Sequence, residues 1–289
     1  MAKDVRNVGY SFRVSNNATD RADPVPFPRF AGRNGTRPDP ARVSALADRG
    51  ERVIELHGEQ TQRGPETRRI RSFVCRPGRI TDAQRRALAI HWARFGVETQ
   101  GPLDPVKVFG RRGPLYLEIG FGMGDALMEM ALADPEGNYL GAEVYEPGIG
   151  RLLNNLNARD IGNARVMRGD AVEILARCIP QDSLDGVFVY FPDPWPKKRH
   201  HKRRLVQPDF VSLVCSRLRP GGRFELATDW ADYAEHMLRA LEAAPDPVNT
   251  AGPGNFSPRP SHRPVTKFER RGQGKGYGIW DLVFRRRET

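Results

Sequence analysis

Beyond Gly113 the sequence alternates between short apolar runs and longer amphipathic stretches. The short runs have the length and composition of buried strands. They are Leu115–Ile119, Tyr139–Val144, Ala164–Arg168, Gly186–Phe191, Arg223–Thr228 and Ile279–Phe284. Apolar residues recur at helical spacing in the stretches between most of them, at Asp125–Ala133, Pro147–Arg159, Ala171–Ile179, Gln207–Leu218 and Trp230–Ala244. This alternation predicts an α/β fold with a doubly wound parallel sheet.

The amino-terminal part of the chain has a different composition. Residues 1–67 are rich in proline, arginine, asparagine and glycine and contain few large aliphatic side chains. Such a segment buries too little apolar surface to offset the entropy of ordering the chain. We therefore predict a disordered extension over residues 1–67 and a folded domain over residues 68–289. Within that domain, Thr81 followed by Gln84 three residues later predicts the start of a helix.

The charge balance indicates an anionic partner. Lys plus Arg number 46 and Asp plus Glu number 35, which gives the 289-residue chain a formal charge of +11. An excess of this size favours binding to nucleic acid or to an acidic membrane surface. No stretch approaches the roughly 18 consecutive apolar residues of a membrane span, and the first residues lack the apolar core of a signal peptide. We expect a cytoplasmic protein.

The cysteines indicate neither a disulfide framework nor a zinc site. Cys75, Cys178 and Cys215 are far apart and odd in number, and the sequence has no C-x-x-C pair or His/Cys cluster. Each cysteine has apolar neighbours, so we expect buried free thiols and no bound metal.

A glycine-rich turn follows the first predicted strand. Gly120, Gly122 and Gly124 alternate there, which lets the backbone turn tightly and approach a ligand closely. A dinucleotide site would have G-x-G-x-x-G around a diphosphate, but Asp125 stands where the third glycine belongs. Asp125 and Glu118 would repel a diphosphate and suit a cationic ligand. S-adenosylmethionine carries a sulfonium and an amino group and fits these charges.

Two further acids end the next two strands. Glu143 ends the second strand, where a carboxylate can accept hydrogen bonds from both ribose hydroxyls. Asp170 ends the third strand, where an adenine edge would lie. Each acid alone is explained as a helix cap, most readily Asp170. The glycine turn, Glu143 and Asp170 arriving in strand order predict a pocket for S-adenosylmethionine.

The fourth strand leads into FPDPWPKKRHHKRR, residues 191–204. Two prolines make the loop stiff, so Asp193 can be held at a fixed place beside the methyl donor. Trp195 offers a stacking face. The cationic run that follows has two readings: a solvated basic loop, or a surface for RNA phosphates. Its position next to the predicted site favours the second.

These segments resemble the bacterial tRNA (guanine-N7-)-methyltransferase family. The matching stretches, within residues 70–289, are RSFVCRPGRIT, LEIGFGMG, LGAEVYEPGIG, VMRGDAVEIL, FPDPWPKKRHHKRR, ATDW and RPVTKFERRG. The glycine turn indicates only the wider methyltransferase superfamily, whereas PDPW with its basic run and a later TKFE is specific to the family. The resemblance implies a Rossmann-like class I methyltransferase fold, with a mostly parallel seven-stranded sheet and an antiparallel carboxyl-terminal edge.

The resemblance also implies an activity and the residues that carry it. The activity is transfer of a methyl group from S-adenosyl-L-methionine to N7 of the variable-loop guanine of tRNA, position 46, giving 7-methylguanosine. The methyl donor is expected at Glu118, Gly120, Gly122, Gly124, Glu143, Asp170 and Asp193, with Asp193 catalytic. The substrate is expected at Lys197, Asp229, Thr266, Lys267, Phe268 and Glu269. RNA contacts are expected at Arg199, His200, His201, Lys202, Arg203 and Arg204.

The chemistry of N7 limits what Asp193 has to do. Guanine N7 carries no proton, so methyl transfer needs no general base, but the base becomes cationic as the bond forms. A carboxylate near the ring can offset that charge, or accept hydrogen bonds from guanine N1–H and the exocyclic amine, or both. We expect Asp229 and Glu269 to complete the base pocket.

Two other functions remain open at the level of sequence. An adenine-N6 or protein methyltransferase is the nearest rival, but an N6 enzyme is expected to have D-P-P-W or N-P-P-Y, whereas one proline separates Asp193 from Trp195 here. A non-catalytic RNA-binding module with the same fold is the other, and the full set of pocket carboxylates argues against it. No spare apolar face is evident, so we expect a monomer.

Overall fold

The computed structural model describes residues 72–73, 79–274 and 276–288. All of them belong to one compact unit that starts at Pro65. The extension predicted over residues 1–67 lies outside the described residues, and so does Cys75. Cys178 and Cys215 are buried free thiols, as predicted.

An eight-stranded sheet forms the centre of this unit, with the strand order β1-β4-β3-β2-β5-β6-β8-β7. The strands are β1 Gly96–Val97, β2 Leu115–Ile119, β3 Asn138–Glu143, β4 Ala164–Arg168, β5 Leu184–Tyr190, β6 Leu218–Thr228, β7 Pro247–Asn249 and β8 Trp280–Arg286. All pairs from β1 through β6 are parallel, and β8 pairs antiparallel with both β6 and β7. The predicted antiparallel carboxyl-terminal edge is therefore confirmed, and the two-residue β1 adds one strand to the seven expected.

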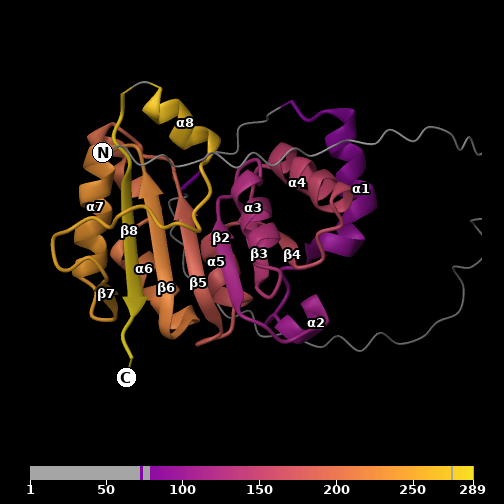
Figure 1. Ribbon diagram of the computed structural model, residues 1–289, viewed down its shortest axis with the longest axis horizontal. Coiled ribbons are helices and arrows are strands. Elements are labelled where there is room, and N and C mark those ends of the chain that lie inside the picture. The colour runs from indigo at the N-terminus through magenta and orange to yellow at the C-terminus, as the bar shows by residue number, and fades with distance from the viewer. Residues whose placement is uncertain (1–71, 74–78, 275, 289) are drawn as a thin grey trace, which may run out of the picture. The chain divides into compact units, whose positions relative to one another are not determined.

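Helices cover both faces of the sheet (Figure 1). Their bounds are α1 Asp82–Phe95, α2 Pro105–Phe109, α3 Asp125–Ala133, α4 Glu146–Ala158, α5 Ala171–Arg177, α6 Pro208–Arg217, α7 Ala231–Glu242 and α8 Lys267–Gln273. One buried cluster packs α1, α3 and α4 against the sheet, and a second packs α5, α6 and α7. This is the doubly wound arrangement that the alternating pattern predicted.

The strand order creates a switch point between β2 and β5. From β2 the chain winds outward through β3 and β4, and it then returns to place β5 on the other side of β2. In open α/β sheets the crevice for a ligand lies at such a point, beyond the carboxyl ends of the strands. In Figure 1, α8 lies over this end of β5 and β6.

Besides β1, three of these helices and strands were not predicted from the sequence. The segment after Pro264 forms α8, because Thr266 caps it by accepting a hydrogen bond from the Glu269 N–H at 3.1 Å. The other two, α2 and β7, are only five and three residues long. Among the described residues, no helix has the length and hydropathy needed to cross a membrane.

Candidate functional site

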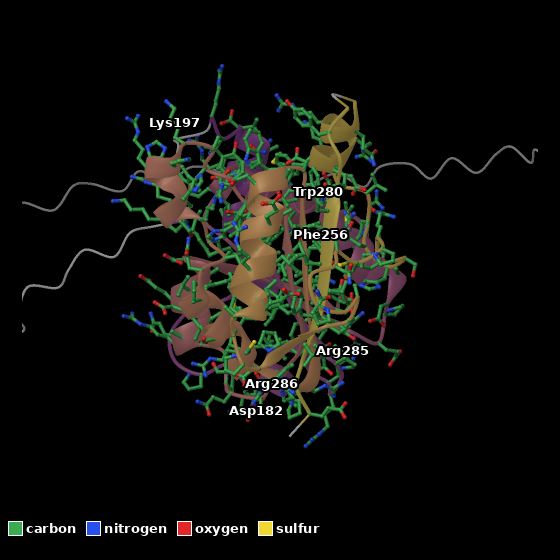
Figure 2. All side chains as sticks on the ribbon, turned by 90° about the vertical axis from the view of Figure 1, so that its left-hand side faces the viewer. Asp182, Lys197, Phe256, Trp280, Arg285 and Arg286 are labelled. Carbon is green, nitrogen blue, oxygen red and sulfur yellow. The ribbon has the colours of Figure 1, made fainter. Side chains whose placement is uncertain are left out.

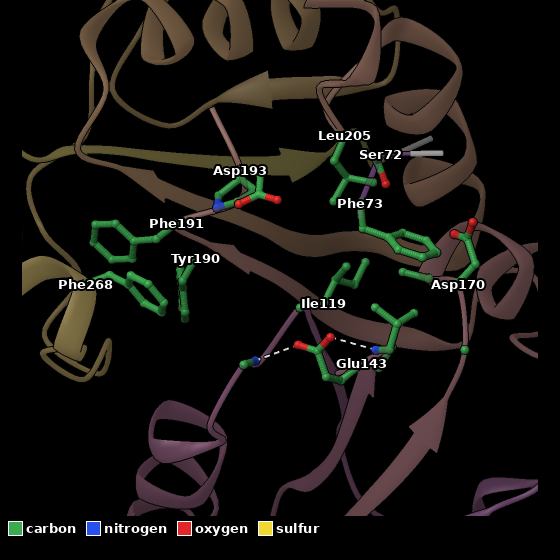
Figure 3. Close-up of a pocket in the computed structure, with 17 residues that line it drawn as sticks. Ser72, Phe73, Ile119, Glu143, Asp170, Tyr190, Phe191, Asp193, Leu205 and Phe268 are labelled. Carbon is green, nitrogen blue, oxygen red and sulfur yellow. Dashed lines mark hydrogen bonds between the residues drawn. The ribbon is translucent and has the colours of Figure 1, made fainter. Parts of the chain in front are cut away.

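A pocket lies at the switch point, beyond the carboxyl ends of β2, β3, β4 and β5 (Figure 3). Five of the predicted donor-binding residues line it: Gly120, Gly122, Glu143, Asp170 and Asp193. Phe268, which was predicted to contact the substrate, lines it as well. Figure 3 shows Asp193, Tyr190 and Phe268 at one side of the pocket and Asp170 at the other. The structure thus brings residues from seven separate segments of the sequence into one cavity.

The glycine turn needs its glycines for backbone reasons. Gly120, Gly122 and Gly124 have φ of 71°, 58° and 79°, a region that other residues rarely adopt. Gly148 in α4 lets that helix approach the turn, since a Cβ there would lie 1.8 Å from the Gly122 carbonyl oxygen. Gly124 does not line the pocket; it caps the start of α3 and packs against Leu152.

Glu143 is 9 % exposed and is held by three backbone donors. Its Oε2 accepts from the Gly122 N–H at 2.8 Å, and its Oε1 accepts from Val144 and Tyr145 at 2.6 and 2.9 Å. These bonds fix the carboxylate between β3 and the glycine turn. A carboxylate has about four lone-pair sites, so acceptor capacity remains for hydroxyl groups of a ligand.

Glu118 is buried beneath the glycine turn and is 3 % exposed. It does not line the pocket, and its Oε2 has no hydrogen-bond partner among the described residues. Burial raises the pKa of this carboxyl to about 8, and the charges of Glu143 and Asp125 act in the same direction. A buried acid with an unpaired oxygen and a raised pKa is a candidate for contact with a ligand.

Asp170 serves as a helix cap and as a pocket wall. Its Oδ1 accepts from the Val172 N–H at 2.9 Å, which caps α5, and the residue lines the cavity opposite Asp193. The capping interpretation was therefore correct, and it does not compete with ligand contact because a second carboxylate oxygen remains.

The loop that holds Asp193 is shaped by backbone strain at both ends. Phe191 and Trp195 have φ of 55° and 46°, a left-handed conformation that costs roughly 1–3 kcal/mol at a residue other than glycine. Between them stand Pro192 and Pro194, whose rings fix φ. The Phe191 N–H donates to the Ala227 carbonyl at 2.8 Å, which ties the loop to β6. The surrounding structure thus imposes one conformation on the loop.

Trp195 does not offer the free stacking face that the sequence suggested. Its Nε1–H donates to the Ser72 carbonyl at 3.0 Å, the Arg203 guanidinium lies 5.1 Å from its ring centroid, and His200 packs edge-on. Ser72 and Phe73 line the pocket. Neither residue is among the predicted site residues, although both lie in the RSFVCRPGRIT stretch.

The basic run forms a short 3₁₀ helix, η2 Lys198–Arg203, directly after the Asp193 loop. Lys197, Arg199 and Lys202 are exposed, and His200 and Arg203 are partly exposed around Trp195. Figure 2 shows Lys197 and Trp280 at the same end of the molecule, opposite the end marked by Arg286. The cations thus lie at the end of the sheet that carries the pocket.

Arg204 and His201 differ from the rest of the run. Arg204 is 2 % exposed. Its Nε–H donates to the Pro194 carbonyl at 3.0 Å, and its Nη2 binds Asp232 and lies 3.1 Å from His201 Nε2. The structure therefore gives Arg204 protein partners in place of the predicted RNA phosphate.

Asp229 lies in a different pocket from Asp193. That second cavity, about 530 Å³, is lined by Asp229, Trp230, Ala231, Asp232, Gly276, Tyr277, Gly278 and Trp280. Helix α8 lies near both cavities: its Phe268, 55 % exposed, lines the first, and its Gly272 packs against Asp229, which lines the second. Lys267 is exposed, and Thr266 caps the helix.

Glu269 is not available to a base. It is 1 % exposed, and its Oε2 binds Nη1 of the equally buried Arg263 at 2.6 Å. Arg263 also pairs with Asp281 on β8 at 2.6 Å, and Arg259 reaches Glu269 at 3.2 Å. Burial lowers the pKa of Arg263, but hydrogen bonds and attraction from the two carboxylates outweigh this and raise it. Glu269 thus anchors α8, and the predicted substrate contact does not fit its position.

The chain is similar to known methyltransferases over most of its length. Residues 112–282 match the family described as "Putative methyltransferase". A tRNA (guanine-N(7)-)-methyltransferase of Alkalilimnicola ehrlichii is 58% identical over 224 residues, covering 76% of this chain and 94% of the relative. The enzyme of the same name from Alcanivorax borkumensis is 53% identical and covers 80% of this chain and 97% of the relative. The 16S rRNA methyltransferase KamB is similar in structure, with a TM-score of 0.46 and 15% identity, over 65% of this chain and 95% of KamB.

Proposed function

The chain belongs to the tRNA (guanine-N7-)-methyltransferase family, and we propose that its pocket serves methyl transfer from S-adenosyl-L-methionine to N7 of the guanine at position 46 of tRNA. The fold is that of a class I methyltransferase, with the sheet order and the antiparallel edge described above. The rival functions, an adenine-N6 or protein methyltransferase and a non-catalytic RNA-binding module, have no support from these relatives.

The residues around the pocket fit the methyl donor. Glu143 retains lone pairs for the ribose hydroxyls, and Asp170 lies across the cavity where an adenine edge can be bound. Glu118 keeps one oxygen without a hydrogen-bond partner among the residues that the structure describes. When bound, S-adenosylmethionine supplies an electrophilic methyl group on a positively charged sulfur. The carboxylates of Glu143 and Asp170, which line the cavity, match that charge.

Asp193 acts on the base. It lines the donor pocket and stands on a loop whose conformation is fixed at both ends. The N7 lone pair attacks without loss of a proton, so the residue need not be a base. The carboxylate stabilises the positive charge that develops on the guanine ring, and this interaction is stronger in the transition state than in the ground state.

The exposed cations after Asp193 bind the RNA. Lys197, Arg199 and Lys202 point to solvent next to the loop, and Arg203 can contact a phosphate from its place over Trp195. The target guanine lies in a folded RNA, and enzymes that modify such bases usually extrude them. Phosphate contacts on both sides of the guanine hold the strand while the base enters between Asp193 and Phe268.

Several finer points are part of this proposal. We assign the domain to residues 68–289, and the alignment with nearly whole relatives supports this. We also propose that the enzyme acts as a monomer, without a metal ion, in the cytoplasm. Within the described part of the chain, no group of three or more potential metal ligands is present.

The observation that carries the proposal is the meeting of Glu143, Asp170 and Asp193 in one cavity at the switch point. The test incubates the protein with S-adenosylmethionine labelled in its methyl group and with bulk tRNA, followed by digestion to nucleosides. We expect the label in 7-methylguanosine. Label in N6-methyladenosine or in protein would support a rival, and no transfer at all would contradict the proposal.

A further inference from the structure

The last arginine of the basic run faces away from solvent, although the sequence gives no sign of this. Arg203 and Arg204 are neighbours in the same cationic stretch, yet Arg203 is partly exposed and Arg204 is 2 % exposed. A buried guanidinium has to satisfy its donors within the protein. The partners of Arg204 are therefore informative about what it does.

One partner belongs to the loop that carries Asp193. The Arg204 Nε–H donates to the carbonyl of Pro194, the residue directly after Asp193, at 3.0 Å. This carbonyl lies between two residues with left-handed backbone, Phe191 and Trp195. A strained loop keeps its conformation only when neighbouring groups hold it, and the Arg204 bond is one of these restraints.

The other partners fix Arg204 itself. Its Nη2 binds Asp232 at the start of α7, its guanidinium carbon lies 4.9 Å from the ring centroid of Tyr233, and His201 Nε2 lies 3.1 Å from Nη2. Arginine has no acceptor, so in this contact the guanidinium donates and His201 Nε2 accepts. The guanidinium thus connects a rigid helix to the back of the Asp193 loop.

We propose that Arg204 is a positioning residue, which holds the Pro192–Trp195 loop so that Asp193 meets the target base, and that it does not bind RNA. This inference rests on the proposed function of the pocket. Displacement of a catalytic group by about 1 Å can reduce the rate about 10²-fold. Loss of Arg204 therefore affects the chemical step, whereas loss of its exposed neighbours affects tRNA binding.

The first experiment compares Arg204→Lys with Arg203→Lys. Lysine keeps the charge but cannot reach Pro194 and Asp232 with a planar fork. For Arg204→Lys we expect methyl transfer under single-turnover conditions to fall by about 10–100-fold, with an unchanged salt dependence of tRNA binding. An effect on tRNA binding alone would show that Arg204 contacts RNA and would overturn the proposal.

A double-mutant cycle separates positioning from general stability. If Arg204 acts through Asp193, then Arg204→Lys should cost less than about twofold in single-turnover rate in an Asp193→Asn background. Equal losses in both backgrounds would show an independent structural role and refute the inference. Asp232→Asn weakens the contact that anchors Arg204 to α7, and Asp232 itself is half-exposed, so this variant should fold. It serves as the test if Arg204→Lys fails to fold. It should give the same kinetic pattern, and a normal transfer rate in Asp232→Asn would contradict the proposal.

The wild-type protein separates this inference from the proposed function. If it forms 7-methylguanosine and Arg204→Lys does so equally fast, only the role of Arg204 is wrong. If the wild type forms none, the function itself is wrong.

Discussion

The buried acid Glu118 makes the stability of the free protein depend on pH. Its pKa is raised from 4.5 to about 8, chiefly by burial. Between these values the folded protein holds a proton that the unfolded chain releases. The contribution of this proton to stability is complete below pH 4.5 and is lost as the pH rises to about 8.

The size of the change in stability follows from the difference in proton binding between the folded and unfolded states. One bound proton corresponds to a fall in the free energy of unfolding of about 1.4 kcal/mol per pH unit. Between about pH 6 and pH 8 the wild type should lose about 2 kcal/mol from this group, or about 4–8 °C in melting temperature for a protein of this size. Glu118→Gln cannot ionise and should lack this loss.

The assay is urea denaturation of the ligand-free protein at both pH values. The stability difference between Glu118→Gln and wild type should shift by about 2 kcal/mol in favour of the variant from pH 6 to pH 8. Any effect of the glutamine amide on stability that does not depend on pH cancels when the two pH values are compared. Glu129→Gln, on the exposed face of α3, is the matched control and should follow the wild type. Parallel loss of stability in wild type and Glu118→Gln would refute the reasoning.

Three further predictions concern catalysis, RNA binding and the anchor of α8. Asp193→Asn should lower the single-turnover rate by about 10²–10³-fold, and a near-normal rate would remove Asp193 from the chemistry. Neutralising Lys202 and Arg203 together should raise the KM for tRNA and flatten its dependence on salt, as measured by filter binding and kinetics; unchanged binding would count against the RNA surface. Arg263→Met leaves two buried carboxylates without their partner and should destabilise the protein by about 3–5 kcal/mol in urea denaturation. The half-exposed Arg259→Met is the control, with an expected loss below about 1 kcal/mol, and equal losses would contradict the buried-pair argument.

Local patterns in the sequence were sufficient to predict most of the sheet and to identify several residues that meet in one pocket. The strands β2 and β4 have the predicted bounds because their apolar runs end sharply at polar or glycine residues. Gly122, Glu143 and Asp170 meet because the carboxyl ends of parallel strands lie at one edge of a sheet. Residues that directly follow successive predicted strands can therefore be expected to lie close together in space.

Side-chain direction was not predictable in the same way. Arg203 and Arg204 have the same chemistry and adjacent positions, and only the path of η2 turns the second one inward toward Asp232. Glu269 is an acid like those that line the pocket, but it pairs with the buried Arg263, which also binds Asp281. Arg263 and Asp281 lie six and 12 residues from Glu269 in the sequence. Such pairings arise from tertiary packing, on which a single sequence carries no signal.

Replacement of guanine by 7-deazaguanine at position 46 of a tRNA transcript tests the central claim most directly. This change removes the nitrogen that accepts the methyl group and keeps the edges used in base pairing. We expect methyl transfer to the unmodified transcript and none to the 7-deaza transcript. Equal transfer to both would show that the enzyme methylates a different atom.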